Sequence, residues 1–204
     1  MPPRVPTVLP LENLFKGRSG VREGHLTTTQ LAAFFRAART AEEKSLFNLV
    51  YAYGLRVSEA GSMPLAALHP PTIDIVRLKR SRAGVFPLLS KVGTLLTAWL
   101  KERPQSKWLF PHHEDSSAPL DKWSIGRMFR RISKQAGLPT ELQHPHVLKH
   151  SIATHLLASG WDIRRVQEWI GHADIRSTSV YAEVGKELME VGASEVSKLL
   201  GSLQ

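Results

Sequence analysis

The feature that most limits the possible folds is a change of sequence texture between Thr72 and Leu88. Two short runs rich in β-forming residues, Ile73–Leu78 and Val85–Leu88, flank the polar turn Arg80–Gly84, which predicts an antiparallel hairpin. On both sides of this stretch, apolar residues recur at helical spacing between capping and stop signals. We therefore expect a mostly α-helical domain with one small antiparallel β-sheet.

Capping and stop signals mark the expected helices. Thr27–Thr29 can cap a first helix, and Gly54 can end a second, because glycine accepts the left-handed conformation at a helix end. Pro145 suits the first turn of a later helix, where a backbone N–H is not needed. The further signals are Ser90 before Val92–Glu102, Ser124 before Ile125–Ala136, Gly137, Gly160, and Asp162 and Gly171 around Ile163–Ile170. The apolar residues expected to be buried in the first two helices are Leu31, Phe34, Phe35, Leu46, Leu49, Val50 and Tyr53.

Length and composition favour one globular domain. The chain has 204 residues, of which 42% are hydrophobic, enough to bury a core. The longest uncharged apolar stretches, such as Ser45–Leu55 and Val92–Leu100, are far shorter than a membrane span. The N-terminus lacks the apolar run of a signal peptide, so we expect a cytoplasmic protein. The absence of cysteine excludes disulfides, thiolate zinc sites and cysteine nucleophiles.

The positive charge of the chain indicates a polyanionic partner. Lys and Arg total 27 against 18 Asp and Glu, which gives a formal charge of +9 and an isoelectric point near 10.1. A field of this sign attracts nucleic acid, the commonest large polyanion in a cytosol. A basic protein without a nucleic-acid partner is the alternative that charge alone leaves open.

Four segments contain residue types suited to a reaction at a phosphate. They are, in chain order, Gly54–Glu59 (Gly-Leu-Arg-Val-Ser-Glu), the expected hairpin with Lys79, His144–His150 (His-Pro-His-Val-Leu-Lys-His), and Gly171-His172 followed nine residues later by Tyr181. Arg56 stands at an expected helix start, where a guanidinium fork and backbone N–H groups both favour an anion. His146 and Lys149 lie three residues apart on a helix, so both can face one phosphate.

Together these segments resemble the active-site signature of the tyrosine recombinases of the phage integrase family, which contains an Arg, a Lys, His-x-x-Arg, a His or Trp, and then a Tyr. The likeness extends from about Leu26 to Val184. Within the family, the segment Arg77–Arg80 (Arg-Leu-Lys-Arg) and the small size of the chain most resemble those of the fimbrial phase-variation invertases. The resemblance implies the catalytic-domain fold of this family over residues 25–185. It also implies site-specific DNA recombination through a 3′-phosphotyrosine intermediate, by integration, excision or inversion.

The resemblance assigns a role to each residue of the signature. The implied roles are Tyr181 as nucleophile, Arg56 as phosphate clamp, Lys79 as general acid for the leaving 5′ oxygen, His146 as proton donor or shuttle for the tyrosine, and Lys149 and His172 as donors to the phosphate oxygens. Glu59 is expected to orient a cationic neighbour. The residues expected to contact DNA are Arg77, Arg80, Arg82 and His150. Neither a metal nor a cofactor is expected.

Each of these residues also has a simpler explanation when it is taken alone. Arg56 could be a solvated arginine at a helix end, and Tyr181 a half-buried core or interface residue. Any basic residue of the hairpin could be a plain phosphate contact. The histidine-rich patch could pack or bind a metal, although it lacks the His-Glu-x-x-His arrangement of hydrolytic zinc sites. The histidines of this patch are His144, His146, His150 and His155.

Two features depart from the family pattern. Lys149 stands where the family has its second arginine, and lysine keeps the charge but loses the two-pronged hydrogen bond. Residues 1–24, expected to form a flexible arm, are too few for the separate core-binding domain that many relatives carry. Residues 186–204 form an apolar tail, which in relatives docks on a neighbouring subunit of a tetramer. Packing of this tail on its own domain is the alternative.

Three functions therefore remain open. The first is an active site-specific recombinase, the second a DNA-binding protein of the same fold weakened by Lys149, and the third a type IB topoisomerase-like enzyme. The order and spacing of the four segments favour the first. The expected partner is double-stranded DNA with inverted-repeat half-sites, bound by a homotetramer without membrane association. We expect the protein in the cytoplasm, at the nucleoid, of a prokaryote or as a phage product.

Overall fold

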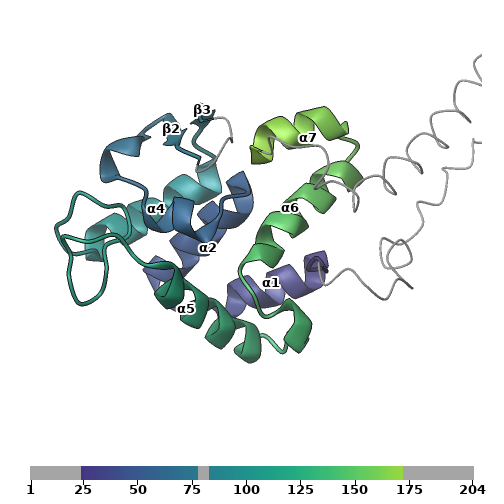
Figure 1. The fold of residues 1–204 in the computed structure, drawn as a ribbon, viewed down its shortest axis with the longest axis horizontal. Helices are drawn as coiled ribbons and strands as arrows, with labels where there is room; N and C mark the ends of the chain where they lie inside the picture. The colour runs from purple at the N-terminus through teal and green to yellow at the C-terminus, as the bar shows by residue number, and fades with distance from the viewer. Residues whose placement is uncertain (1–23, 78–82, 172–204) are drawn as a thin grey trace, which may run out of the picture. The chain divides into compact units, whose positions relative to one another are not determined.

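Helices make up most of the described chain (Figure 1). The structure is a computed structural model that describes residues 24–77 and 83–171. The α-helices of these two ranges are α1 (Thr28–Ala37), α2 (Ala41–Tyr53), α3 (Val57–Gly61), α4 (Ser90–Glu102), α5 (Lys122–Gln135), α6 (His146–Ala158) and α7 (Ile163–Ile170), with short 3₁₀ helices η2 (Leu65–Ala67) and η3 (Thr140–Leu142). None of the helices in these ranges has both the length and the apolar character needed to cross a bilayer.

The β-rich stretch forms the sheet that the sequence predicts. β2 (Thr72–Ile75) pairs antiparallel with β3 (Gly84–Pro87), and β1 (Leu68–His69) pairs antiparallel with the other side of β2. Ile73 lies opposite Phe86, and Ile73 is completely buried because alternate residues of β2 face the core. The prediction of a mostly α-helical chain with a small antiparallel sheet is confirmed.

Local signals set four helix ends as predicted. The Thr27 side chain accepts a hydrogen bond from the backbone N–H of Gln30, whose own side chain accepts one from the backbone N–H of Thr27. Asp162 caps α7 by accepting from two backbone N–H groups of its first turn. Gly54 and Gly171 end α2 and α7 with φ of 58° and 67°, a left-handed conformation that favours glycine.

Two predicted N-caps are wrong. α4 begins at Ser90 itself, with Leu89 in the N-cap position and no side-chain cap bond. α5 begins at Lys122, because Asp121 accepts from two backbone N–H groups, one of which belongs to Ser124. A carboxylate is a stronger acceptor than a hydroxyl, so the aspartate caps the helix three residues before the predicted cap.

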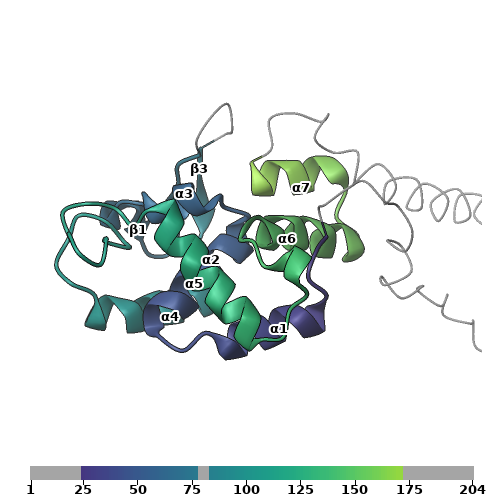
Figure 2. The ribbon, with the colours of Figure 1, turned by 60° about the horizontal axis from the view of Figure 1, so that its bottom comes forward.

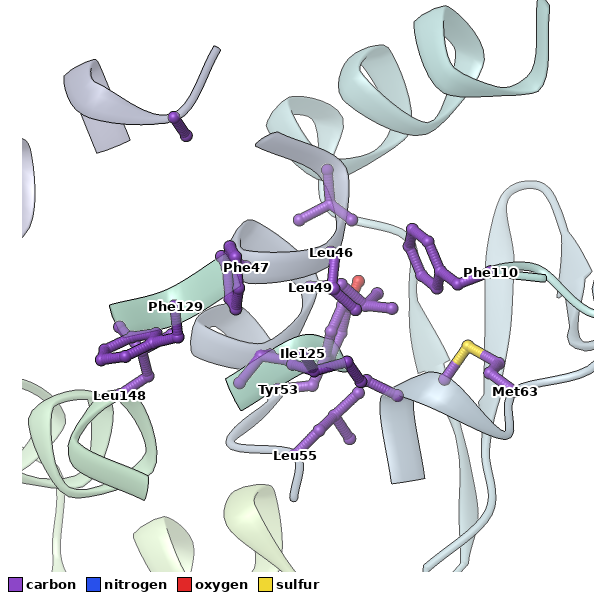
Figure 3. Packing of buried hydrophobic residues seen from close by; sticks show 14 of the residues in the cluster. Leu46, Phe47, Leu49, Tyr53, Leu55, Met63, Phe110, Ile125, Phe129 and Leu148 are labelled. Atoms are coloured by element: carbon purple, nitrogen blue, oxygen red, sulfur yellow. The ribbon is translucent and has the colours of Figure 1, made fainter. Parts of the chain in front are cut away.

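The hydrophobic core is built around α2. Phe47 of this helix is completely buried, and its ring lies 5.4 Å from that of Phe34 in α1 and 5.6 Å from that of Phe129 in α5, centroid to centroid. The rings of Phe34 and Phe129 are 4.7 Å apart. We call these three rings the aromatic core. Figure 3 shows α2 side chains beside residues of α5 and of the loop that carries Phe110. Burial of one such side chain stabilises the fold by about 1.5–3 kcal/mol.

The packing of α7 brings together two helix ends that carry motif residues. α7 lies beside α6 in both views (Figures 1 and 2). Its last residue, Ile170, touches the end of α2, since a Cβ on Gly54 would lie 2.8 Å from Cγ2 of Ile170. The C-terminal ends of α2 and α7 therefore meet, and the chain that leaves α2 leads directly into Arg56.

Candidate active site

Arg56 lies where α2 ends and α3 begins. It occupies the N-cap of α3, and the carboxylate of Glu59, one turn later, accepts from its backbone N–H and from its Nη1, both at 2.8 Å. The Glu59 side chain has no exposed surface, whereas that of Arg56 is 37% exposed. The buried carboxylate holds the guanidinium through Nη1 while the side chain stays partly exposed, which suits a phosphate clamp.

Arg77, expected to contact DNA, lies instead inside the protein. Its side chain has no exposed surface. Nη1 donates to the carbonyl oxygen of Gly54 at 3.1 Å, and Nη2 donates to those of Tyr53 and Trp169, both at 2.8 Å. Nη1 also lies 3.8 Å from Oε2 of Glu59. Burial lowers the pKa of Arg77 to about 10, against the influence of the Glu59 carboxylate. The expectation of a DNA contact does not fit this environment, because the guanidinium is enclosed by protein acceptors.

Lys149, on α6, is also buried. It is 1% exposed, and its Nζ donates to the carbonyl oxygen of Ile170 at 2.8 Å. Burial lowers the pKa of Lys149 from 10.5 to about 7, with Arg77 and Arg56 lowering it further and Glu59 opposing them. These four residues interact electrostatically, and we call Arg56, Glu59, Arg77 and Lys149 the charge cluster. Near neutral pH, Lys149 therefore exists in charged and neutral forms.

The charge cluster contains more positive than negative charge. When Lys149 is protonated, the four described residues of the cluster comprise three cations and one carboxylate, that of Glu59. Positive charge held away from water is costly unless an anion lies nearby. Arg56 is the cation of the cluster with substantial exposed surface, so an anion from solution can reach the cluster there. The arrangement is suited to binding a phosphate group.

His146 and His150 lie in the first turns of α6 and differ in exposure. His146, the first residue of the helix, is exposed, whereas His150 is only 9% exposed. Their rings pack nearly perpendicular with centroids 4.8 Å apart. The expectation that His150 contacts DNA does not fit its burial beneath His146. His146 has the surface to meet a ligand, while Lys149, expected to face the same phosphate, points into the protein.

The histidine-rich patch is partly structural. Nε2 of His155 donates to the carbonyl oxygen of Leu26 at 2.9 Å, and its Nδ1 then accepts from the Tyr51 hydroxyl at 2.8 Å. Burial lowers the pKa of His155, which favours this neutral form. His155 thus ties α6 to α2 and to the start of the described chain. Across residues 24–77 and 83–171, no three His, Asp or Glu side chains are grouped as a metal ion would require.

Several residues of the predicted site lie outside the described residues. They are Lys79, Arg80, Arg82, His172 and Tyr181. Arg77 precedes Lys79 by two residues, and Gly171 directly precedes His172, so the described structure ends next to both. The roles of these five residues stay predictions, as do those of the tail 186–204 and of the arm 1–24, of which only Gly24 is described.

Sequence reasoning missed the internal position of Arg77, although a signal for it exists. Ile73, Ile75 and Arg77 alternate along one strand direction and all three are buried, while Val76 is 57% exposed. The basic run 77–82 favoured an assignment to DNA, because charged residues are rarely buried unless they are paired. The pairing groups come from distant segments, which strand alternation does not reveal.

Comparison with known sequences gives a family. Residues 25–187 match the sequence model described as the phage integrase family. The tyrosine recombinase XerD of Caulobacter vibrioides is 36% identical over 151 residues, which cover 70% of this chain and 49% of that protein. The tyrosine recombinase XerD of Listeria monocytogenes is 33% identical over 153 residues, covering 71% of this chain and 50% of that protein. The chain thus spans about half the length of these curated relatives.

Comparison with solved structures gives the same fold. The crystal structure of the XerA recombinase aligns with a TM-score of 0.69 at 22% identity, covering 82% of this chain and 64% of that one. A XerH site-specific recombinase bound to palindromic difH substrate, in a post-cleavage complex, aligns with a TM-score of 0.68 at 26% identity, covering 85% and 53%. The predicted tyrosine recombinase catalytic-domain fold is confirmed.

Proposed function

The chain belongs to the phage integrase family, and from this premise we propose that it is a site-specific DNA recombinase that cleaves and rejoins DNA through a 3′-phosphotyrosine intermediate. The observation that carries the proposal is the charge cluster, in which Arg56 is held by a buried carboxylate and has a partly exposed side chain beside two further cations. The similarity to proteins named tyrosine recombinases, and to a XerH recombinase bound to its difH substrate after cleavage, supports it.

In the proposed reaction, the phenolic oxygen of Tyr181 attacks the scissile phosphorus and the bond from phosphorus to the 5′ oxygen breaks. The 3′ side of the strand stays on the tyrosine as a phosphodiester. Lys79 gives a proton to the leaving 5′ oxygen, and His146 takes the proton of the tyrosine. Resealing reverses these steps when a 5′ hydroxyl attacks the phosphotyrosine. The covalent bond conserves the energy of the phosphodiester, so no ATP is needed.

Negative charge develops on the non-bridging oxygens during the attack. Arg56 and His172 would donate to these oxygens, and the loss of one such donor typically costs about 10²- to 10³-fold in rate. Glu59 holds Arg56 from two sides before DNA arrives, so the clamp needs little rearrangement. Lys149 adds positive charge from the interior when it is protonated. These groups supply the stabilisation without a metal ion in the proposed mechanism.

The environment of Lys149 favours a second candidate, a DNA-binding protein of the same fold with little chemical activity. Its Nζ bonds to the carbonyl oxygen of Ile170, and lysine lacks the fork that would reach two phosphate oxygens. Loss of one charge-assisted hydrogen bond costs about 1.5–3 kcal/mol, or about ten- to a hundred-fold in rate. For an active enzyme, Lys149→Arg should preserve or raise single-turnover cleavage and Lys149→Ala should lower it at least about tenfold. Cleavage by the arginine variant alone would establish the second candidate.

The proposed partner is double-stranded DNA with inverted-repeat half-sites, bound by four copies of the chain at the nucleoid of a prokaryotic or phage-infected cell. The net charge of +9 supports binding through phosphate contacts, whose affinity falls steeply with salt. A topoisomerase-like enzyme is less well supported, because the relatives quoted above are named recombinases.

A nicked duplex tests the nucleophile. The DNA site is first selected from a random duplex library by its binding to the protein. A nick near the crossover point then lets the short cleaved fragment diffuse away, which traps the covalent adduct. Tyr181→Phe should abolish the adduct and leave DNA affinity within a few-fold, because only the phenolic oxygen is lost. Tyr51→Phe removes a phenolic hydroxyl elsewhere, and this control should keep the adduct.

The outcomes separate the candidates. An adduct formed by Tyr181→Phe would refute the assignment of the nucleophile. No adduct with the wild-type protein would favour the DNA-binding candidate. Relaxation of supercoiled DNA without recombinant products from two sites would favour a topoisomerase. Cleavage should continue in EDTA, because no step of the proposed mechanism uses a metal ion.

A further inference from the structure

One guanidinium joins three segments that are distant in the sequence. Arg77 follows the end of β2, and its Nη atoms donate to the carbonyl oxygens of Tyr53 and Gly54 at the end of α2. The same side chain donates to the carbonyl oxygen of Trp169 in the last turn of α7. Separate hydrogen bonds to two helix ends make Arg77 a direct link between the end of β2 and both α2 and α7, in addition to the hydrogen bond from the Trp169 indole to the carbonyl oxygen of Ala52.

Each segment that Arg77 joins continues within a few residues into a predicted catalytic residue. Gly54 precedes Arg56 by two residues, Arg77 precedes Lys79 by two, and Trp169 precedes His172 by three. Three residues of the signature are therefore connected, through two or three residues of backbone each, to groups that Arg77 joins by hydrogen bonds. A shift of these groups by an ångström would be passed to all three residues through very short lengths of backbone.

The two helix ends need a cation where they meet. The last carbonyl groups of a helix lack partners within the helix and carry the negative end of its dipole. At this meeting point, Arg77 and Lys149 supply the donors, Arg77 to three carbonyl groups and Lys149 to that of Ile170. Arginine is suited to bind three of these carbonyl groups because its planar guanidinium presents several N–H groups in fixed directions.

The packing around Arg77 leaves little room for another arrangement. A Cβ on Gly171 would lie 2.5 Å from Nε of Arg77, so the glycine that ends α7 rests directly against this side chain. Glu59, which holds Arg56 by two hydrogen bonds, lies 3.8 Å from Nη1 of Arg77. Arg77 and Arg56 are thus coupled through one carboxylate as well as through the backbone.

We propose that Arg77 is a positioning residue of the active site, which sets Arg56, Lys79 and His172 relative to one another by joining β2 to the ends of α2 and α7. This inference rests on the proposed function. Arg77 itself touches no DNA, since its side chain has no exposed surface. Its loss should therefore slow the chemical step while leaving DNA affinity nearly unchanged.

The test compares Arg77→Met and Arg77→Lys with Arg103→Met. Arg103 also donates from Nη2 to two backbone carbonyls, those of Ser106 and Trp108, but it joins no segment that leads into a signature residue. Arg103→Met therefore removes comparable hydrogen bonds and serves as the structural control. Single-turnover cleavage of the nicked duplex is measured at saturating DNA and well below each unfolding midpoint. Arg77→Met should slow cleavage at least about 100-fold with the dissociation constant within about threefold, while Arg103→Met stays within about twofold. Arg77→Lys keeps the positive charge but loses the planar fork, so its cleavage rate should lie between those of Arg77→Met and Arg103→Met. This variant also provides the test if Arg77→Met does not fold.

A second substrate separates positioning from general loosening. In a duplex with sulfur in place of the bridging 5′ oxygen, the leaving thiolate needs no proton, so the position of Lys79 matters less. The defect of the Arg77 variants should then shrink at least about fivefold, and a defect of the same size on both duplexes would overturn the part of the inference that concerns Lys79. Arg77 variants that cleave like Arg103→Met would overturn the inference while the proposed function stands. Absence of an adduct with the wild-type protein would overturn both.

Discussion

The aromatic core, formed by α1, α2 and α5, and the charge cluster, formed by residues of α3 and α6 and by Arg77 after β2, act on stability in opposite directions. The rings of Phe34, Phe47 and Phe129 leave water at a gain, about 1.5–3 kcal/mol for each side chain. In the charge cluster, cations leave water at a cost, which appears as the lowered pKa of Lys149. The comparison shows how the chain can hold an excess of positive charge near a surface. The favourable free energy of burying the aromatic core offsets the unfavourable free energy of burying the cations.

The largest expected loss of stability comes from a substitution in the aromatic core. Phe47→Ala should lower the free energy of unfolding by about 3–5 kcal/mol, because the removed ring leaves a cavity between α1, α2 and α5. Urea unfolding measures the change. Phe35→Ala, at a partly buried position next to Phe34, should cost clearly less. Equal losses at both positions would show that stability is not concentrated in the aromatic core.

The second prediction concerns the cost of burying Lys149. Its pKa is about 7 in the folded chain and 10.5 when exposed, so the unfolded chain binds more protons between these values. The free energy of unfolding should therefore rise with pH from about 7 to 10, by roughly 4 kcal/mol at most. Lys149→Met should lack this rise, whereas Lys91→Met, on the exposed start of α4, should keep it. Urea unfolding at pH 6, 8 and 10 gives the slopes, and parallel curves for all three proteins would contradict the burial of the charge.

The third prediction compares two buried glutamates that have the same local role. Glu59 and Glu43 each stand at the N3 position of a helix, accept a hydrogen bond from the backbone N–H of the N-cap residue, and pair with an arginine. Changing either to Gln should cost about 1–3 kcal/mol, because a charge-assisted hydrogen bond to a partly exposed arginine is weakened. Only Glu59→Gln leaves the charge cluster without a carboxylate, and a sulfate ion bound there would then compensate the positive charge. Millimolar sulfate should therefore raise the unfolding midpoint of Glu59→Gln more than that of Glu43→Gln. The same response to sulfate in both variants would argue against an anion site at Arg56.

The smallest expected effect lies outside both regions. Thr27→Ala removes the capping box of α1 and should cost about 1 kcal/mol. Thr29→Ala, at an exposed position in the first turn of the same helix, should cost a few tenths of a kcal/mol. Cleavage per folded molecule should be unchanged in both, as single-turnover assays would show. A large loss of cleavage in Thr27→Ala would mean that α1 influences the site directly.

Features that depend on neighbouring residues could be predicted from the sequence. The residue type alone was sufficient to predict four helix ends, because each of these residues acts within one turn of the helix that it caps or ends. They are Thr27, Asp162, Gly54 and Gly171. The hairpin followed from β-forming runs on both sides of a polar turn. Ser124 shows where such reasoning fails, because a stronger acceptor nearby took its place as the cap.

The sequence by itself determined the family signature, several of the helix ends and a glutamate, Glu59, suited to orient a cationic neighbour, since it stands one turn after Arg56. Only the tertiary structure decided which cations face solvent. Arg77 is buried because a carbonyl 92 residues away accepts its hydrogen bond, and Lys149 because Ile170 does the same across two helices. A cation can leave water only where acceptors from separate segments meet, and that meeting depends on packing rather than on any local pattern.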